Sequence, residues 1–293
     1  MLFRSFLKDA GLLVSTAGGM EVGEHGEEVL FSLKEIIRNL HGLSDMEKAL
    51  AARLGLKHVL IVPGDSDEDE AVKKEIARAT ARFLAETLRD GDVLAVTGGT
   101  TLAEVARSFP SSGQERDLTV VPARGGLGEE VELQANTVAA SLAQRLGGRH
   151  RLLHVPDDLG EEARSTIASE PKIRELIELI RSARVLLHGV GPADDMARRR
   201  AMPEEDMQML KERKAVGEAF GYYFDREGRI VYTTSSVGMR FEDLKDVELV
   251  VVVGGGHSKA EAALAVLSSQ LQDVYITDEG AAKGMLRRLG VQV

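Results

Sequence analysis

The sequence predicts an α/β protein built around a doubly wound, mostly parallel β-sheet. Short apolar runs rich in Val, Ile and Leu alternate with helical patterns along most of the 293 residues. Most of these runs are apolar throughout, as parallel strands covered by helices on both faces require. Apolar residues make up 43% of the chain and aromatic residues 4%, which suits a core packed from aliphatic side chains.

The predicted elements follow one another in the order of a doubly wound sheet. The expected parallel strands are His58–Val62, Val93–Val96, Leu118–Val121, Leu152–Val155, Val185–Val190, Leu249–Val253 and Val274–Thr277. Helical patterns lie between them, at Asp69–Arg89, Thr101–Ser108, Val131–Leu146, Ile173–Arg181, Lys259–Leu267 and Glu279–Leu289. The segment Gly221–Thr234 differs, because it alternates polar and apolar residues around a turn at Asp225–Gly228. It predicts an antiparallel hairpin inserted before the last parallel strands.

Residues 1–45 follow another pattern. Phe6–Leu13 predicts the end of a helix, Val14–Val22 predicts two short strands around Ala17-Gly18-Gly19, and Glu27–Leu40 has apolar residues at helical spacing. A helix, a small hairpin and a second helix form the last part of a winged-helix module. A small α+β appendage would give the same pattern, so the pattern alone leaves both possibilities open.

Composition excludes several classes of function. No apolar run reaches the roughly 18 residues of a membrane span, and Lys8 and Asp9 interrupt the N-terminus too early for a signal peptide, so we expect a cytoplasmic protein. The chain has no cysteine, which excludes disulfides and thiolate metal sites. Its 37 basic and 47 acidic residues give a net charge of −10, which argues against nucleic-acid binding over the general surface. An anionic ligand must therefore be held by local groups.

A glycine turn between a strand and a helix is the strongest functional signal. The apolar strand Val93–Val96 leads through Gly98-Gly99-Thr100-Thr101 directly into a helical pattern. Glycines let the backbone approach an anion closely, and the N–H groups and dipole of a helix N-terminus favour negative charge. The turn matches neither G-x-x-x-x-G-K-[ST] nor G-x-G-x-x-G, so it indicates phosphate without indicating ATP or NAD. An ordinary strand–turn–helix junction is the alternative.

Two cations follow other strands, at the carboxyl-terminal edge where open α/β sheets bind their ligands. Arg124 precedes two glycines in the loop after the third predicted strand, where it can make bidentate bonds to a phosphate. Lys259 ends the glycine turn Gly254–Lys259 at a helix start, where a cation opposes the helix dipole unless an anion compensates it. Both residues favour an anion site, although Arg124 could also be a surface arginine made conspicuous by its glycines.

Three further features allow two interpretations each. The run Arg198–Arg200 either faces solvent or meets a second phosphate. Glu218, among small and aromatic residues, either accepts hydrogen bonds from sugar hydroxyls or caps a turn. Asp278 and Glu279 either accept sugar hydroxyls or cap the following helix, and capping is the favoured interpretation.

Catalytic and metal functions find less support. His150 and His154 are four residues apart with no third ligand nearby, so no metal site is predicted. His257 has no carboxylate partner identifiable from the sequence, and no G-x-S-x-G motif is present. Lys259 occupies the place of the third glycine of a dinucleotide-binding fingerprint, which argues against an oxidoreductase.

A set of segments taken together resembles a known family. They are VTGGTT (96–101), VPARGG (121–126), QANT (134–137), GEAFGYYF (217–224), SVGM (236–239), GGGHSKAEA (254–262) and TDEGAA (277–282). From about Met46 onward they are similar, in the same order, to the effector-binding domain of the SorC family of bacterial sugar-responsive regulators. Upstream, FLKDAGLLV through EEVL resembles the end of the family's winged-helix DNA-binding domain and its linker. The resemblance therefore implies two domains, a partial winged helix with linker at 1–45 and a phosphosugar effector-binding domain at 46–293.

The resemblance also implies a Rossmann-like domain, related to sugar-phosphate isomerases and deaminases, that binds a phosphosugar without turning it over. Fructose 1,6-bisphosphate is the implied effector, and repression of glycolytic genes the implied activity. The glycine turn, Arg124 and Lys259 would hold one phosphate, and the other implied contacts would reach the sugar or its second phosphate. Arg198 and Arg200 remain open as alternatives to Arg199. The implied ligand contacts are Gly98, Gly99, Thr100, Thr101, Arg124, Gln134, Arg199, Glu218 and Lys259.

We therefore expect a ligand-sensing repressor, with no cofactor, metal or membrane, rather than an enzyme. Phosphosugar binding would change the packing between protomers of a dimer or tetramer and so alter how attached DNA-binding modules sit on an operator. Because Met1 falls near the end of the expected recognition helix, these residues alone are not expected to bind DNA specifically. The alternative is a sugar-phosphate isomerase or deaminase, whose acid/base groups would come from Glu218, His257, Asp278 and Glu279.

Overall fold

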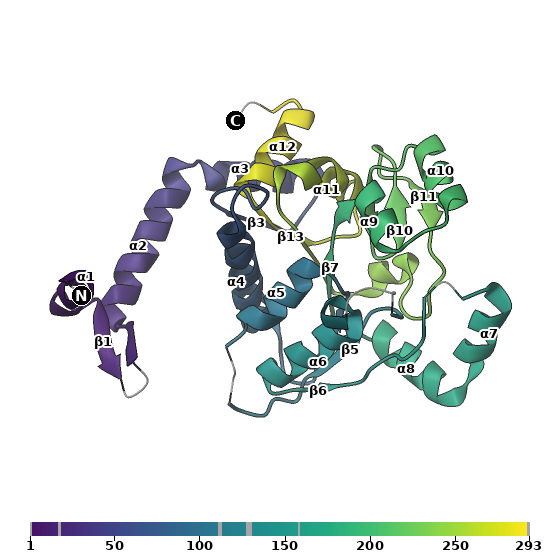
Figure 1. The fold of residues 1–293 in the computed structure, drawn as a ribbon, viewed down its shortest axis with the longest axis horizontal. Helices are drawn as coiled ribbons and strands as arrows, with labels where there is room; N and C mark the ends of the chain where they lie inside the picture. Colours follow the sequence, from purple (N-terminus) through teal and green to yellow (C-terminus); the bar gives the residue numbers. More distant parts are fainter. Residues whose placement is uncertain (1, 17–18, 111–112, 127–130, 158, 292–293) are drawn as a thin grey trace. The chain divides into compact units, whose positions relative to one another are not determined.

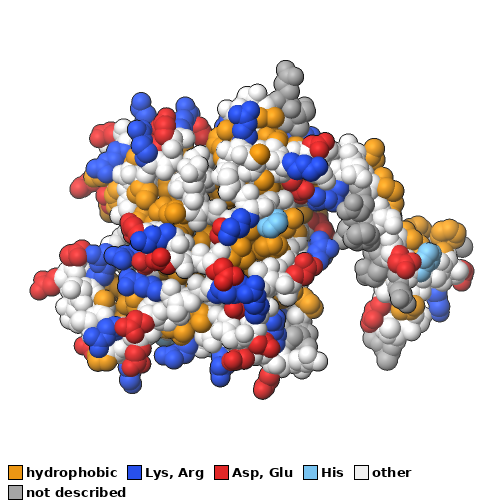
Figure 2. All heavy atoms as spheres, turned by 180° about the vertical axis from the view of Figure 1, so that it is seen from behind, with side chains coloured by type: hydrophobic (Ala, Val, Ile, Leu, Met, Phe, Trp, Pro, Cys, Tyr) orange, Lys and Arg blue, Asp and Glu red, His pale blue; other side chains and the backbone are white. Residues whose placement is uncertain are grey.

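The structure is a computed structural model of the chain, and it consists of two compact units, Met1–Asp45 and Met46–Val293 (Figure 1). The residues that it describes are 2–16, 19–110, 113–126, 131–157 and 159–291. No helix within these ranges is both long and apolar enough to cross a membrane. On the face shown in Figure 2, acidic and basic side chains are interspersed over the larger unit.

The smaller unit has the predicted order of helix, hairpin and helix. Helix α1 (Leu2–Asp9) leads into strands β1 (Leu13–Thr16) and β2 (Gly19–Val22), which pair antiparallel, and α2 (Glu24–Leu40) follows. The first two residues of the predicted turn, 17 and 18, lie outside the described residues. The sequence prediction for this segment is confirmed at the level of its elements.

The larger unit is built on a parallel sheet whose strand order is β3-β13-β12-β7-β4-β5-β6. The strands are β3 (His58–Val62), β4 (Val93–Val96), β5 (Thr119–Pro122), β6 (Arg149–His150), β7 (Val185–Gly189), β12 (Leu249–Val253) and β13 (Val274–Asp278). This architecture confirms the predicted doubly wound, Rossmann-like fold.

Helices cover both faces of this sheet, which explains why its strands are apolar throughout. On one face, Val96, Leu187 and Val253 belong to a core cluster with α4, α5 and α6. Alternate residues such as Ala95 and Val252 are equally buried on the other face. The helices are α3 (Leu43–Leu54), α4 (Glu70–Thr87), α5 (Thr100–Ser108), α6 (Ala135–Leu146), α7 (Glu161–Ser169), α8 (Pro171–Arg181), α9 (Ala193–Arg199), α10 (Glu204–Glu212), α11 (Ala260–Leu267) and α12 (Glu279–Arg288), with 3₁₀ turns η1 (Val131–Leu133), η2 (Phe241–Asp246) and η3 (His257–Lys259).

A second, antiparallel sheet has the strand order β11-β10-β9-β8. The predicted hairpin is confirmed as β10 (Tyr222–Phe224) and β11 (Ile230–Thr233). The sequence did not predict the other two strands, β9 (Gly217–Ala219) and β8 (Gly191–Pro192). Between β9 and β10 lie only Phe220 and Gly221, both at positive φ (59° and 83°), as a tight two-residue hairpin requires.

Two sequence predictions are corrected. Leu152–Val155 is not a strand, because the side-chain amide of Asn136 takes the place of a neighbouring strand: it donates to the carbonyl of Leu153 and accepts from its N–H, both at 3.0 Å. The predicted helix Val131–Leu146 is broken at Gln134, which has extended backbone between η1 and α6. Helix α7 was not predicted because it has no buried residues and hence no apolar periodicity.

Candidate functional site

A pocket in the larger unit gathers residues from chain segments that are far apart in the sequence. It lies where β4 and β7 of the parallel sheet end, beside the antiparallel sheet and the turn that precedes α11. The carboxyl ends of strands are where doubly wound sheets place their ligands. The structure brings around this pocket all the residues implied as ligand contacts, namely Gly98, Gly99, Thr100, Thr101, Arg124, Gln134, Arg199, Glu218 and Lys259.

The turn after β4 places the N-terminus of helix α5 at this pocket. A side chain at Gly98 would overlap the carbonyl oxygen of Leu133, and Gly99 has a φ of 118°, so glycine is required at both positions. No side chain caps α5, and among the described residues no acceptor meets the backbone N–H groups of Thr100 and Thr101. These N–H groups and the helix dipole form a site for an anion.

The glycine turn after β12 has a similar sequence, but its backbone N–H groups have hydrogen-bond partners within the protein. Its backbone N–H groups donate to three carboxylates that come from the loop after β3 and from the end of β13. The pairs are Gly256 N with Asp278 Oδ2 (2.7 Å), His257 N with Asp65 Oδ1 (3.3 Å) and Ser258 N with Asp67 Oδ2 (2.8 Å). This turn is therefore already occupied by negative charge from the protein itself.

Lys259 is what the second turn contributes to the pocket. Its ammonium group makes no ion pair with any described carboxylate. Burial lowers its pKa, the positive charges of Lys73 and Arg199 lower it further, and the carboxylates of Asp67 and Asp278 partly oppose the shift. The guanidinium of Arg199 likewise has no hydrogen-bond partner among the described residues. Two cations that form no ion pair within the described part of the chain thus line a pocket in which the N–H groups of Thr100 and Thr101 also lack a described acceptor.

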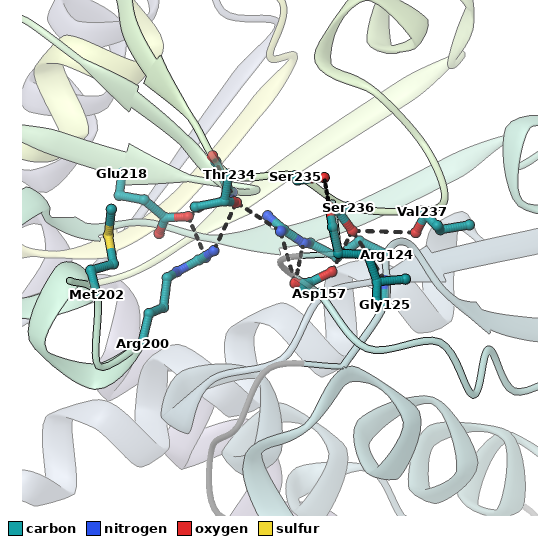
Figure 3. A network of polar contacts seen from close by, with 12 residues as sticks. Arg124, Gly125, Asp157, Arg200, Met202, Glu218, Thr234, Ser235, Ser236 and Val237 are labelled. Carbon is teal, nitrogen blue, oxygen red and sulfur yellow. Dashed lines mark hydrogen bonds and ion pairs between the residues drawn. The ribbon is translucent and has the colours of Figure 1, made fainter. Parts of the chain in front are cut away.

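Arg124 is buried, so the alternative of a surface arginine is wrong. Its exposed fraction is 5%, and its guanidinium pairs with Asp157 at 2.8 Å and donates to Thr234 Oγ1 at 2.9 Å (Figure 3). Burial lowers the pKa of Arg124, and the nearby Asp157 carboxylate opposes that shift. Neither Asp157 nor Thr234 could be identified as a partner of Arg124 from the sequence, because both are distant from it in the chain and belong to no ligand-binding motif.

The three adjacent arginines have different surroundings. Arg198 is exposed and does not line the pocket, although its ion-pair partner Asp195 does. Arg199 and Arg200 both line it. Arg200 is buried and donates to Glu218 Oε1 at 2.6 Å and to the hydroxyl of Thr234 at 3.1 Å. Arg200 is therefore a pocket residue that the resemblance left open.

Glu218 is buried on β9 with one oxygen engaged. Oε1 accepts from Arg200 and from the N–H of Gly221, each at 2.6 Å, which fixes the carboxylate beside the hairpin turn. Oε2 has no hydrogen-bond partner among the described residues. Because Glu218 lines the pocket, Oε2 can accept a hydrogen bond from a ligand hydroxyl.

The other acid/base candidates do not line the pocket. His257 has a carboxylate partner that the sequence did not reveal, since its Nδ1 lies 2.8 Å from Asp65 and this hydrogen bond raises its pKa. Asp278 caps α12 by accepting from the N–H of Ala281, as favoured from the sequence. Glu279 accepts from a backbone N–H and pairs with Lys283 at 2.6 Å. Only Glu218 remains as a pocket carboxylate among these four.

Comparison with known proteins defines the class to which this fold and pocket belong. The family model described as "Putative sugar-binding domain" matches residues 38–287. The central glycolytic genes regulator of Bacillus subtilis is 43% identical over 282 residues, which cover 96% of this chain and 83% of that protein. A SorC family transcriptional regulator from Enterococcus faecalis has a similar structure, with a TM-score of 0.77 and 38% identity over 83% of this chain and 99% of that one.

The class is therefore that of sugar-binding transcriptional regulators. The chain belongs to the SorC family, as its sequence motifs indicated. The full-length sorbitol operon regulator SorC from Klebsiella pneumoniae shares the fold at 21% identity, with a TM-score of 0.76 over 82% of this chain and 80% of that one. These relatives are regulators and not enzymes, which confirms the prediction of a regulator over that of an isomerase or deaminase.

Proposed function

We propose that this chain is a repressor of glycolytic genes whose pocket binds fructose 1,6-bisphosphate as an allosteric effector. The observation that carries the proposal is that one pocket holds an uncapped helix N-terminus together with Lys259 and Arg199, which form no ion pair with any described carboxylate. A ligand that satisfies both needs several negative charges and several hydrogen-bond acceptors, and a bisphosphate has them. The 43% identity to a central glycolytic genes regulator supports the choice of target genes.

One phosphate is proposed to sit on the Gly98–Thr101 turn. The N–H groups of Thr100 and Thr101 would donate to it, and the glycines would allow close approach. Lys259, without a counter-ion among the described residues, would compensate its charge. Each hydrogen bond to a charged group is worth about 1.5–3 kcal/mol.

The second phosphate and the sugar are proposed to occupy the side of the pocket lined by the arginines. Arg124, Arg199 and Arg200 supply the positive charge there. Glu218 Oε2 would accept a hydrogen bond from a sugar hydroxyl, and Gln134 lies at the break before α6 where its amide can reach the ligand. A neutral sugar would leave Arg199 without a counter-ion among the described residues, which favours phosphorylated ligands.

The effector is proposed to act across an interface between protomers of a homo-oligomer in the cytoplasm. Residues 1–45 would belong to a winged-helix domain and linker, which the order of α1, the β1–β2 hairpin and α2 supports. Effector binding would then change how the DNA-binding modules sit on an operator. Such coupling is typically about 1–3 kcal/mol, and operator DNA must change the affinity for the sugar by the same factor.

Isothermal titration calorimetry with fructose 1,6-bisphosphate tests the proposal. We expect saturable binding by the intact chain, weaker binding of fructose 6-phosphate, and none of fructose. Arg199→Met should weaken binding about tenfold, because a charged contact to phosphate is lost. Arg164→Met is the matched control, since Arg164 pairs with Glu161 on α7 and neither residue lines the pocket, and it should bind like the unmodified chain. Absence of binding at millimolar bisphosphate would contradict the proposal.

A further inference from the structure

Two buried arginines beside the pocket are linked in one chain of polar contacts (Figure 3). Asp157 pairs with Arg124, Arg124 and Arg200 both donate to the hydroxyl of Thr234, and Arg200 pairs with Glu218. Each arginine therefore has a carboxylate of its own before any ligand binds. Hydrogen bonds also hold the four charged groups in fixed positions relative to one another.

The two carboxylates differ in their access to the pocket. Glu218 lines the pocket and is the proposed acceptor for a sugar hydroxyl, whereas Asp157 does not line it. Asp157 Oδ2 accepts a hydrogen bond from Nε of Arg124 at 3.1 Å and forms an ion pair with Nη2 at 2.8 Å. A phosphate in the pocket can therefore contact Arg124 while Asp157 keeps its own contact.

A hydrogen bond and close backbone packing also fix the position of the Asp157 carboxylate. Its Oδ1 accepts a hydrogen bond from the hydroxyl of Ser236 at 2.5 Å, and its side chain is 1% exposed. A side chain at Gly125 would overlap the carbonyl oxygen of Val155 and press on Asp157 Oδ1, so the backbone closes around the carboxylate. The negative charge thus has a fixed place and little solvent to screen it.

We infer that Asp157 is a positioning residue that also sets the affinity of the pocket: it neutralises and orients Arg124 in the empty protein and repels the effector's phosphate. The inference rests on the proposed function. Two negative charges that share one buried cation oppose each other, and the opposition is strong where the effective dielectric constant is low. The fixed carboxylate therefore raises the effector concentration at which the sensor responds.

The variant Asp157→Asn separates charge from geometry. Asparagine has the same shape, its oxygen can accept from Arg124, and its NH₂ group can donate to the hydroxyl of Ser236. Removing only the charge leaves Arg124 without its counter-ion in the empty protein and removes the repulsion in the complex. We expect the melting temperature of the empty variant to fall and its affinity for fructose 1,6-bisphosphate to rise at least about threefold. A merely structural role would lower both.

Asp92→Asn is the matched control. Asp92 is a buried carboxylate that pairs with Arg184 at 2.6 Å, and it directly precedes β4, at the end of the sheet opposite the pocket. The same substitution there should lower the melting temperature and leave the dissociation constant for fructose 1,6-bisphosphate unchanged. Isothermal titration calorimetry gives the affinities, and thermal unfolding followed by circular dichroism gives the stabilities.

The outcomes separate the two claims. If the unmodified chain does not bind fructose 1,6-bisphosphate, the proposed function fails. If it binds and Asp157→Asn binds equally or more weakly, only the role of Asp157 is overturned. If Asp157→Asn is unfolded without ligand, Asp92→Asn is brought to the same unfolded fraction with urea. Recovery of the native circular dichroism spectrum at a lower bisphosphate concentration in Asp157→Asn than in Asp92→Asn supports the inference, and recovery at an equal or higher concentration contradicts it. A variant that stays unfolded in saturating bisphosphate contradicts it.

Discussion

Two glycine turns in this protein have similar sequences, but the backbone N–H groups at their helix starts differ in their hydrogen-bond partners. Gly98–Thr101 and Gly254–Lys259 each connect a buried parallel strand to a helix. In the first turn the N–H groups of Thr100 and Thr101 have no acceptor among the described residues. In the second turn the N–H groups of Gly256, His257 and Ser258 donate to protein carboxylates. A glycine turn is thus a place where an anion can bind, and residues elsewhere in the chain decide whether the protein supplies that anion itself.

The largest effect is expected from Gly98→Ala, which obstructs the Gly98–Thr101 turn, here called the open turn. The new methyl group would overlap the carbonyl oxygen of Leu133, so the backbone must move and its N–H groups lose their alignment. We expect at least a hundredfold loss of affinity for fructose 1,6-bisphosphate in calorimetry, and a loss of about 2–3 kcal/mol in the free energy of unfolding.

Gly160→Ala is the control for this change. No atom lies within 4 Å of the position that a Cβ would take at Gly160, and its φ of −57° suits any residue. Its affinity and stability should match those of the unmodified chain. Normal bisphosphate binding by Gly98→Ala would show that the open turn is not the phosphate site.

A smaller effect is expected from Lys259→Met. This substitution removes the charged side chain that the Gly254–Lys259 turn, here called the filled turn, places at the pocket. Affinity for fructose 1,6-bisphosphate should fall about tenfold or more, because a charged hydrogen bond is lost. The melting temperature of the empty protein should stay equal or rise, since burial and the charges of Lys73 and Arg199 disfavour the ammonium form.

Lys283→Met provides the comparison for that result. Lys283 pairs with Glu279 at 2.6 Å and does not line the pocket. Its replacement should leave the calorimetric affinity unchanged. If Lys259→Met and Lys283→Met bind the bisphosphate equally well, the contribution of Lys259 to the anion site is refuted.

The features of the two turns and of the pocket that can be predicted from the sequence are those that depend on residues close together in the chain. The strands were predictable because residues such as Ala95 and Val252 are buried on both faces of the sheet and leave continuous apolar runs. The pocket residues were predictable because they follow strand ends or belong to family motifs. The break at Gln134 was not, because periodicity reports one face of a helix and does not show where the backbone leaves it.

Partners from distant segments were beyond prediction. Asp65 and Asp278 lie far from the second glycine turn in sequence, so nothing local shows that its N–H groups are filled. Asp157 has no motif of its own, although it pairs with Arg124. The loss of a strand at Leu152–Val155 has the same origin, since the amide that replaces the neighbouring strand belongs to Asn136 in another element.

The smallest effect is expected from the pH dependence of the filled turn. The hydrogen bond to Asp65 raises the pKa of His257 above 6.5, so the folded state binds this proton more tightly than the unfolded state. The resulting stabilisation is fully present below about pH 6.5 and is lost as the pH rises through the raised value. The melting temperature should therefore fall less between pH 6 and pH 8.5 in His257→Gln than in the unmodified chain.

Calorimetry completes this prediction, because His257 does not line the pocket and His257→Gln should bind fructose 1,6-bisphosphate normally at either pH. An identical pH dependence of the melting temperature in both proteins would mean that the contact with Asp65 does not stabilise the turn.

The central claim is that the open turn receives the effector's phosphate and the filled turn does not. Backbone amide NMR shifts during titration with fructose 1,6-bisphosphate test it most directly, because an N–H group that donates to phosphate moves strongly downfield. The signals of Thr100 and Thr101 should move in this way, while that of Ser258, already bonded to Asp67, stays nearly unchanged. Downfield movement of Ser258 with stationary Thr100 and Thr101 signals would contradict the account.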